Sequence, residues 1–301
     1  MKVSVAAVVV LYYPELDVLR RLLCSIVGQV EHVFVIDNTP GGTADSYLNI
    51  MGDQSITYQP LHDNYGIAHA HNAGVTLARR SEKTHVLILD QDSELAPNTV
   101  KTLIDESLKL IQMGKKVGAI GPVFIDEKTN EAAPAIKSTF FGGKRSSVNL
   151  DSIEPVLASY IISSGSLISI DVLDHVGGMS DELFIDWVDI EWCERAAGLG
   201  YASYLTPLVS MRHSIGDEFV NFLGRKINLH SDFRNYFIVR NAVYLALWGK
   251  VSLSTRFQLA RKVPIYIFVY SLFSKRKFYS LKLLVLACYD GLVKKMFKGR
   301  F

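Results

Sequence analysis

Alternating apolar and polar segments in the first 125 residues predict strands and helices in turn. The run at residues 3–11 is apolar and rich in valine, as in a parallel strand covered on both faces. Two later apolar runs each end at an aspartate, Asp37 and Asp90, and segments with apolar residues at helical spacing lie between the runs. The expected strands are 3–11, 33–36, 85–89 and 117–125, and the expected helices are 16–27, 72–80 and 99–113. This order predicts an open α/β sheet, which binds ligands beyond the carboxyl ends of its strands.

The pattern changes in the second half of the chain. Residues 142–147 are rich in Gly, Lys and Ser and predict a connection, followed by short strands around 157–170 and a helix at 186–197. Beyond His213, basic helices with aromatic residues replace the alternation of strands and helices. We therefore expect an α/β domain at residues 1–215 and a basic helical region at 216–301.

The two expected regions carry opposite charge, although the whole chain has a net charge of only +2. Residues 216–301 hold 16 of the 32 Lys and Arg but only four of the 30 Asp and Glu, so this region is +12 and residues 1–215 are −10. The basic residues flank aromatic-rich apolar runs, which predicts binding to an anionic membrane surface, with a solvated helix pair or an oligomer contact as alternatives. Nucleic acid is not an expected partner, because no recognisable binding module accompanies the charge.

Composition and cysteine usage exclude several classes of protein. With 49% hydrophobic residues the chain can bury a large core, which excludes a disordered protein. Its three cysteines form no C-x-x-C pair, so neither a disulfide framework nor a zinc knuckle is expected and a reducing cytosol fits best. The apolar runs at 263–274 and 283–293 are too short to span a membrane, which needs about 20 residues. No G-x-G-x-x-G follows the first strand, which argues against a nucleotide-dependent oxidoreductase.

The strongest local signal is the sequence Asp90-Gln91-Asp92-Ser93 at the end of an apolar strand. Two carboxylates one residue apart at a strand tip point the same way, and they suit a hard divalent cation that also binds a diphosphate. A D-x-D pair is common, and the alternative is a strand-end turn in which Asp92 or Ser93 caps the next helix. These residues alone leave both interpretations open.

Upstream, small residues and amide side chains at 64–74 precede that strand. Here Asn64, Gly66 and Asn72 would let a ligand approach the backbone closely at the start of a helix. The alternative is an ordinary helix start with Asn64 as its cap. The nearby histidines are interpreted as packing or surface residues: His62, His69 and His71.

Downstream, carboxylates alternate with tryptophans at the expected start of a helix, in the order Asp186, Trp187, Asp189, Glu191 and Trp192. The helix macrodipole favours acids at such a position, which is the simple account of the charges. That account leaves the large aromatic residues unexplained. An aromatic face beside carboxylates suits a sugar ring, and an apolar neighbour raises the pKa of a carboxylate toward that of a general base.

Together and in this order, the motifs resemble glycosyltransferase family 2, and in particular its bacterial rhamnosyltransferase branch. The resemblance covers about residues 3–248 and rests on the segments 8–14, 35–38, 64–74, 89–93, 163–166 and 184–193. It implies a GT-A fold, which is an open mixed α/β sheet flanked by helices that binds a nucleotide sugar.

The resemblance also implies a role for each matching residue. The expected donor-binding residues are Tyr12, Asp37, Asn64, Gly66, Asn72, Asp90, Gln91 and Arg240. The expected acceptor-binding residues are Ser164, Gly165, Asp186, Trp187, Glu191, Trp192 and Arg234. Asp90, Asp92 and His213 would bind magnesium or manganese, with a buried, backbone-bonded His213 as the alternative. Asp189 would be the general base, although Val188 stands where the family pattern has an acid, so Asp186 and Glu191 stay as alternatives.

The resemblance implies an inverting, metal-dependent transferase. It would move rhamnose from dTDP-rhamnose or a similar nucleotide sugar to a lipid-linked glycan acceptor during synthesis of a bacterial surface polysaccharide, such as O-antigen or capsule. The expected place of work is the cytoplasmic face of the cell membrane, with peripheral attachment. The alternatives are transfer of galactose, glucose or N-acetylglucosamine by the same fold, or a non-catalytic membrane adaptor that keeps the fold.

Overall fold

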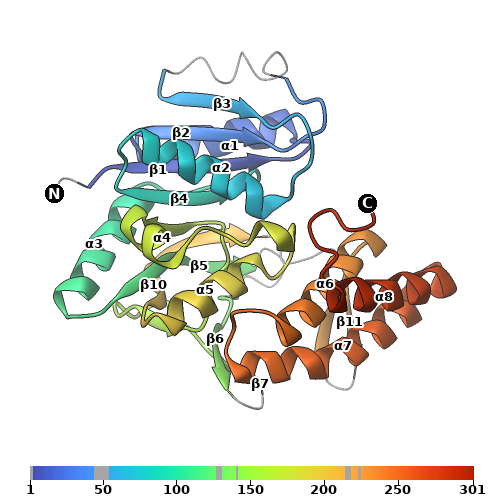
Figure 1. The fold of residues 1–301 in the computed structure, drawn as a ribbon. Helices are drawn as coiled ribbons and strands as arrows, with labels where there is room; N and C mark the ends of the chain where they lie inside the picture. Colours follow the sequence, from blue (N-terminus) through green and yellow to red (C-terminus); the bar gives the residue numbers. More distant parts are fainter. Residues whose placement is uncertain (1–2, 44–53, 127–130, 140–141, 214–217, 223–224) are drawn as a thin grey trace.

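A computed structural model describes the chain except for residues 1–2, 44–53, 127–130, 140–141, 214–217 and 223–224 (Figure 1). The described residues form an eight-stranded sheet of order β3-β2-β1-β4-β9-β5-β10-β8. Its strands are β1 (Val5–Leu11), β2 (His32–Asp37), β3 (Ile56–Pro60), β4 (His85–Asp90), β5 (Val117–Asp126), β8 (Val156–Ala158), β9 (Ser166–Ser169) and β10 (Ala202–His213). The sheet is mixed, because β9 runs antiparallel to β4 and β5 while β1, β2, β3 and β4 are parallel.

Helices cover both faces of this sheet. They are α1 (Leu16–Ile26), α2 (Ile67–Arg80), α3 (Thr99–Gln112), α4 (Ile170–Val176) and α5 (Val188–Gly198), with a short 3-10 helix η2 (Asp181–Leu183). Alternate residues of β1 supply two hydrophobic cores, one shared with α1 and α3 and the other with α2, α4 and α5. All seven residues of β1 are buried, as its continuous apolar sequence predicts.

One glycine sets how closely α2 packs on the sheet. A Cβ atom at Gly74 would lie 2.2 Å from Cγ1 of Val8, so no larger residue fits at this contact. The helix also begins earlier than the expected residue 72, at Ile67, because Gly66 rather than a later residue marks its start. Its first turn therefore lies beside the ends of the central strands.

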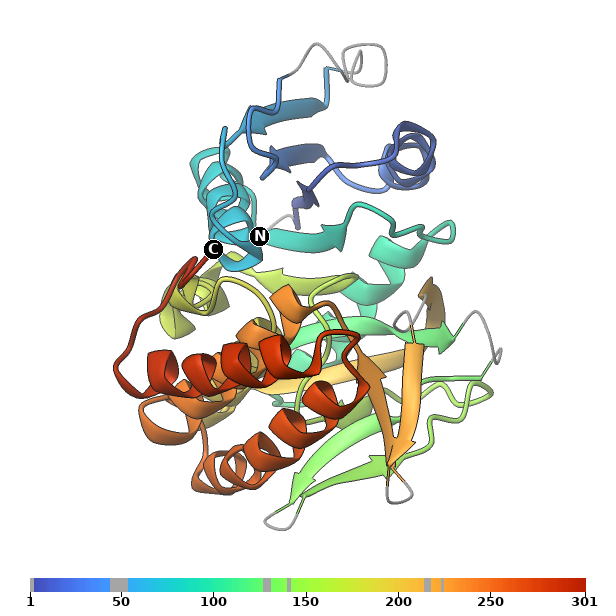
Figure 2. The same ribbon diagram turned by 90° about the vertical axis from the view of Figure 1, so that its right-hand side faces the viewer.

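The C-terminal region contains three long helices, α6 (Asp232–Leu247), α7 (Leu253–Phe273) and α8 (Lys277–Leu292). They pack on one another around a third core of aromatic and aliphatic side chains. In Figures 1 and 2 they lie beside the half of the sheet that contains β5 and β10, away from β1–β3. Within the described residues, no helix is both long enough and apolar enough to cross a membrane.

Two parts of the chain fold differently from the expectation. Residues 142–147 are not a plain connection, because β7 (Gly142–Ser146) pairs with β6 (Ala135–Thr139) as a hairpin. The region after His213 is not entirely helical, because β11 (Glu218–Phe222) and β12 (Arg225–Leu229) form a second hairpin. Polar and apolar residues alternate in β12 from Lys226 to Leu229, which is the period of a strand. The expected boundary near residue 215 lies outside the described residues.

Candidate functional site

The carboxyl ends of β1, β2 and β4 bring the candidate donor residues to one edge of the sheet. In the strand register Leu11 lies opposite Asp37, and Val10 lies opposite Asp90. Tyr12 and Gln91 therefore leave adjacent strands at the same level. The Tyr12 N–H donates to Oε1 of Gln91 at 2.7 Å, and Nε2 of Gln91 donates to the Tyr12 carbonyl at 3.2 Å. This reciprocal pair fixes the loop while the Tyr12 ring stays exposed.

Asp37 lies beneath this edge and is fully buried. Its carboxylate accepts hydrogen bonds from the Thr39 N–H at 2.9 Å and from the Tyr58 hydroxyl at 2.6 Å. The backbone of the same residue accepts from the Leu61 N–H, which joins the ends of β2 and β3. Asp37 thus holds the loop after β2 in shape, and its carboxylate oxygens are both engaged within the chain.

Hydrogen bonds hold the segment 64–66 against the loop after β2. Asn64 accepts at Oδ1 from Nδ2 of Asn38 at 2.9 Å and from the Gly66 N–H at 3.0 Å. Gly66 has a φ of 89°, and a Cβ there would lie 2.5 Å from the Phe184 carbonyl oxygen. Glycine is required on both counts. Asn64 and Gly66 therefore lie where the sequence places them, at the start of α2 and beside the acidic segment around residue 186.

Asn72 lies one turn farther along α2 and has a different role from the expected one. Its Nδ2 donates to the Met179 carbonyl at 2.8 Å and to Oδ1 of Asp181 at 2.5 Å. Its Oδ1 accepts a hydrogen bond from the Met179 N–H at 2.8 Å. It therefore holds the 177–181 turn in place. Of the nearby histidines, His69 pairs with Asp181 at 3.0 Å and His71 is buried, so both are packing or surface residues as expected.

Asp90 and Asp92, the candidate metal ligands, follow β4 directly. Asp90 is partly buried, and Asp92 is exposed. The Asp90 N–H donates to Oγ of Ser164 at 3.2 Å, and Ser164 shares a 2.5 Å hydrogen bond with Ser93. The 164–165 loop thus packs against the D-x-D turn. Ser164 is buried, and the Gly165 N–H donates to the carbonyl oxygen of Ile88 in β4. The acceptor-binding role expected for these two residues stays a prediction.

No group of three or more metal-ligating side chains occurs among the residues that the structure describes. His213 ends β10 opposite Asp126, and its side chain lies outside the described part. The metal prediction therefore rests on the two aspartates. Their oxygen atoms are the ligands that magnesium and manganese prefer, and Mg²⁺ commonly takes only one or two carboxylates from protein.

Asp189, in the first turn of α5, is the carboxylate with the most unusual environment. Removal from water raises its pKa from 3.8 to about 6, and the nearby charges of Asp186 and Asp90 act in the same direction. No ion pair in the described part of the chain includes Asp189. Its Oδ1 accepts only the N–H of the next residue, Ile190, at 2.8 Å. A carboxylate with this pKa, near enough to Asp90 for their charges to interact, can act as a general base near neutral pH.

The two alternative bases, Asp186 and Glu191, each form an ion pair with an arginine. Asp186 receives Nη2 of Arg234 at 2.6 Å. Glu191 is buried between Arg195, at 2.9 Å, and the Ser180 hydroxyl, at 2.7 Å. These contacts favour Asp189 over both.

The two tryptophans of this segment point in different directions. Trp192 is buried in the core, where its Nε1 donates to the Gly177 carbonyl at 2.8 Å, so it cannot form the expected sugar platform. Trp187 is only partly buried, and its Nε1 donates to Ile238 of α6 at 3.0 Å. Trp187 remains a candidate platform beside the carboxylates.

The backbone that carries Asp186 and Trp187 is strained. Phe184, Asp186 and Trp187 have φ values of 66°, 62° and 67°. Residues with side chains rarely adopt this conformation, and such strain gathers at functional sites. Asn241 of α6 holds the segment by donating to the carbonyl groups of Leu183, Ile185 and Asp186. The sequence gives no sign of the strain, because none of the three strained residues is a glycine.

The expected donor ligand Arg240 is a structural residue instead. Its side chain is fully buried. The guanidinium donates to the carbonyl groups of Phe297 at 2.6 Å and Leu183 at 2.9 Å, and to Oδ1 of Asn241 at 2.9 Å. It joins the end of the chain to the loop before the acidic segment. Arg234 and Arg240 stand six residues apart, which suggests that both bind a phosphate, but their side chains lie in different environments.

Residues that the sequence did not single out also border the site. Tyr160 is close enough to Asp189 for their charges to interact, and Tyr266 of α7 interacts in this way with Asp186. Lys262 of α7 lies 5.6 Å from the centre of the Trp187 ring. A scan of motifs could not find these residues, because they stand far from the acidic segment in sequence and carry no pattern of their own.

Comparisons with known proteins agree with this geometry. The family model for Glycosyl transferase family 2 matches residues 7–176. A curated relative, "dTDP-rhamnosyl transferase RfbF" of Shigella flexneri, is 32% identical over 293 residues, which is 97% of this chain and 96% of that protein.

Solved structures match the fold at lower identity. GalNAc-T7 with UDP, GalNAc and Mn²⁺ matches with a TM-score of 0.58 and 13% identity, over 91% of this chain and 58% of that one. Residues 1–349 of S. aureus TarS in complex with UDP match with a TM-score of 0.53 and 13% identity, over 97% of this chain and 87% of that one. These matches confirm the fold expected from the sequence.

Proposed function

The chain belongs to glycosyl transferase family 2, and on that premise we propose that it transfers rhamnose from dTDP-rhamnose to a glycan acceptor by direct displacement with inversion. Rhamnose as the transferred sugar is supported by the Shigella relative, which this chain matches over 97% of its length. The observation that carries the mechanism is the environment of Asp189, a carboxylate whose pKa is raised by removal from water and by the nearby charges of Asp186 and Asp90.

The donor nucleotide would bind along the ends of β1, β2 and β4. The exposed ring of Tyr12 offers a surface for the base. The segment 64–66 would lie beside the sugar and diphosphate, because its glycine brings the backbone of α2 close to the acidic segment.

Asp90 and Asp92 would hold the divalent cation. Their fit rests on chemistry seen in the structure: carboxylate oxygens stand at the tip of β4, and the charge of Asp90 disfavours ionisation of Asp189 nearby. A cation would relieve that crowding of negative charge. When bound, it would supply electrostatic stabilisation of the departing diphosphate.

The chain's own residues would carry the proton transfer. Asp189 would accept the proton of the acceptor hydroxyl as that oxygen attacks the anomeric carbon, while the bond from this carbon to the phosphate oxygen breaks and its electron pair leaves with dTDP. A single displacement inverts the anomeric centre. Trp187 and Tyr160 would line the acceptor side, and Arg234 would orient Asp186 beside them.

The acceptor we propose is a lipid-linked glycan of a bacterial surface polysaccharide, reached from the cytoplasmic face of the membrane. The basic charge of residues 216–301 supports peripheral attachment. Transfer of another sugar is the second candidate, since the structural neighbours are bound to UDP and, in one case, GalNAc.

A donor screen tests the proposal. The full chain is incubated with a lipid-diphosphate glycan and dTDP-rhamnose, UDP-galactose, UDP-glucose or UDP-N-acetylglucosamine, each with Mn²⁺ and with EDTA. We expect a rhamnosylated product from dTDP-rhamnose that EDTA abolishes. Preference for a UDP-sugar would replace rhamnose in the proposal. Binding of anionic vesicles without cation-dependent affinity for any nucleotide would indicate a non-catalytic adaptor.

A further inference from the structure

The outer side of α7 is apolar where a water-facing helix is normally polar. Hydrophobic residues recur on it at helical spacing and are exposed: Leu253, Phe257, Pro264, Ile265, Phe268 and Leu272. Two polar residues of the same helix, Thr255 and Gln258, are buried instead. The buried side also carries Leu259, Val269 and Tyr270, so apolar residues occur on both sides of α7, and a helix of this kind is normally covered on both sides.

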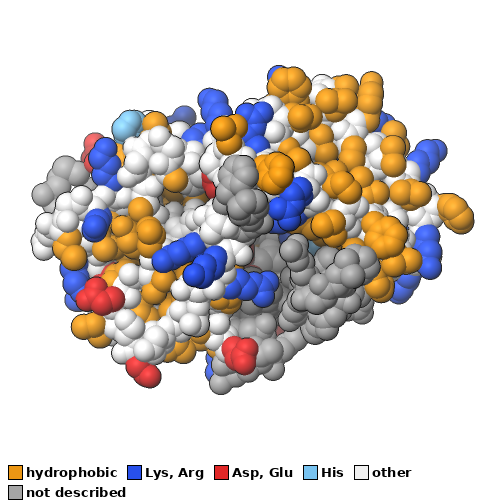
Figure 3. All heavy atoms as spheres, turned by 90° about the horizontal axis from the view of Figure 1, so that it is seen from below, with side chains coloured by type: hydrophobic (Ala, Val, Ile, Leu, Met, Phe, Trp, Pro, Cys, Tyr) orange, Lys and Arg blue, Asp and Glu red, His pale blue; other side chains and the backbone are white. Residues whose placement is uncertain are grey.

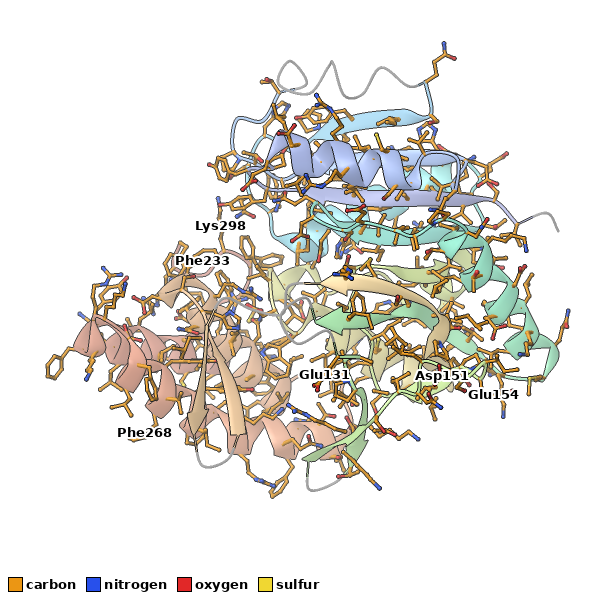
Figure 4. All side chains as sticks on the ribbon, turned by 180° about the vertical axis from the view of Figure 1, so that it is seen from behind. Glu131, Asp151, Glu154, Phe233, Phe268 and Lys298 are labelled. Atoms are coloured by element: carbon orange, nitrogen blue, oxygen red, sulfur yellow. The ribbon has the colours of Figure 1, made fainter. Side chains whose placement is uncertain are left out.

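The outer side of α8 repeats the pattern. Its exposed stripe contains Phe278, Leu281, Val285, Tyr289 and Leu292, while Leu283, Leu284 and Ala287 pack inward. Phe278 is 91% exposed, an unusual value for so large an apolar side chain. Figure 3 shows hydrophobic side chains gathered over this end of the molecule, and Figure 4 shows Phe268 on the side of the helices away from the sheet. We call this surface, made of the two exposed stripes, the outer helical face.

Basic side chains border the outer helical face. Lys275 lies in the turn between α7 and α8, where Arg276 pairs with Asp232 at 3.1 Å, and Lys277 begins α8. Arg261 and Lys282 lie within the stripes. Residues 250–301 contain a single acid, Asp290, which is buried and paired with Arg300 at 2.5 Å. The face is thus mainly apolar, with cations within the stripes and at the α7–α8 turn, and residues 250–301 have no exposed carboxylate.

We propose that the outer helical face docks on an anionic lipid membrane, with the aromatic and aliphatic side chains in the interface and the cations against lipid headgroups. A lipid surface satisfies both parts at once, because it offers hydrocarbon below a layer of negative charge. A second copy of the chain fits less well: a two-fold contact would place the same cations against each other, with no exposed carboxylate to pair them.

This docking would also orient the candidate site, an implication that rests on the proposed function. The inner side of α7 carries Lys262 and Tyr266, which lie near Trp187 and Asp186. One helix therefore has the acceptor side of the site on its inner surface and the membrane on its outer surface. The separation is about the diameter of a helix, roughly 10 Å, a short reach for a glycan anchored in the same membrane.

Vesicle sedimentation tests the docking without any sugar or nucleotide. The full chain is mixed with vesicles of phosphatidylcholine alone or of phosphatidylcholine with phosphatidylglycerol. We expect pelleting with the anionic vesicles only. The double variant Leu272→Ser/Phe278→Ser should lower the fraction bound at least tenfold, since both side chains are exposed and their loss leaves the fold intact. Ile153→Ser, which changes an exposed residue outside the outer helical face, should pellet like the wild type.

A second variant gives a signal that does not depend on loss of binding. Phe278→Trp should show a blue-shifted emission on addition of anionic vesicles, because the new indole enters a less polar region. Equal pelleting of wild type and the double variant, or no shift for Phe278→Trp, would overturn the proposal. So would a dimer in analytical ultracentrifugation that Leu272→Ser/Phe278→Ser dissociates while vesicle binding persists. Because dTDP-rhamnose is absent from these assays, failure of docking and failure of the rhamnosyl assignment are separate results.

Discussion

At the scale of single residues, Asp189 has a different environment from the two neighbouring carboxylates, Asp186 and Glu191. Asp186 and Glu191 are each paired with an arginine, at 2.6 and 2.9 Å, whereas burial and nearby negative charge raise the pKa of Asp189. The sequence could not make this choice, because all three acids lie within six positions. The distinction arises partly from another element, since Arg234 on α6 pairs with Asp186, and partly within α5, where Arg195 lies four residues after Glu191.

Replacing Asp189 by asparagine should remove the base and keep the shape of the site. General-base catalysis contributes roughly 10²–10⁴-fold, so we expect kcat of Asp189→Asn to fall by about that factor. Affinity for dTDP, measured by calorimetry with Mn²⁺, should change little. Glu194→Gln, on the same helix but bonded to Thr255 and Ser252, is the matched control and should keep most of the activity. A rate for Asp189→Asn equal to that of the wild type would remove the residue from the mechanism.

The raised pKa of Asp189 also predicts how activity depends on pH. The carboxylate must be ionised to accept a proton, and the nearby negative charge and burial raise its pKa to about 6. We therefore expect kcat/KM to rise about tenfold per pH unit below pH 6 and to level off above it. A rate that stays constant from pH 5 to pH 8 contradicts this role; these pH values bracket the pKa of about 6.

At the scale of elements, one buried carboxylate on α8, Asp290, joins this helix to α6. Asp290 is fully buried, bonds Arg300 at 2.5 Å and accepts the Tyr236 hydroxyl at 2.7 Å. Loss of the Asp290 carboxylate leaves the buried Tyr236 hydroxyl without its acceptor, which typically costs about 1–3 kcal/mol, whereas the partly exposed Arg300 side chain can turn to water. We expect Asp290→Leu to lower the free energy of unfolding by about this amount in urea titration.

Asp174→Leu is the control for that experiment. Asp174 pairs with Arg79 at the surface, where both side chains are about half exposed, and such pairs contribute about 0–1 kcal/mol. Equal destabilisation by the two variants would show that the buried pair has no special role.

The sequence predicts the elements of the sheet better than their contacts. The strands that end at Asp37 and Asp90 were predicted from continuous apolar runs, and they flank β1, one on each side. Arg240 and Trp192 were interpreted as ligand contacts, and both are buried because tertiary packing decides the direction of a side chain. The strand pair β11–β12 was missed, since the many basic residues around it obscured a short alternating pattern.

At the scale of the whole molecule, the division of charge matches the division of the fold. Residues 1–215, which form the sheet and its helices, hold the acidic excess, and residues 216–301, which include α6–α8 and the segments around them, hold the basic excess. The two parts nevertheless form one structure: Arg240 and Asn241 bond the loop 183–186, and Lys298 bonds Asp63 at 2.8 Å beside the candidate donor segment (Figure 4). Deleting residues 251–301 would therefore uncover the core of α6 as well as remove the basic surface.

Raising the salt concentration tests the basic surface without deleting part of the chain. Each basic residue near an anionic membrane contributes about 1 kcal/mol, and the Debye length falls from about 10 Å at 0.1 M to about 3 Å at 1 M ionic strength. We expect NaCl at about 1 M to release most of the protein from phosphatidylglycerol vesicles while circular dichroism stays unchanged. Binding that is insensitive to salt would assign the attachment to the apolar residues alone.

The configuration of the sugar product tests the central claim most directly. Carbon-13 or proton NMR of the glycan formed from dTDP-rhamnose reports whether the anomeric centre has been inverted. The proposed single displacement with Asp189 as base predicts a rhamnosyl product of the opposite anomeric configuration to the donor, formed with Mn²⁺ and not with EDTA. A product that retains the donor configuration, or one that forms equally well in EDTA, would contradict this account.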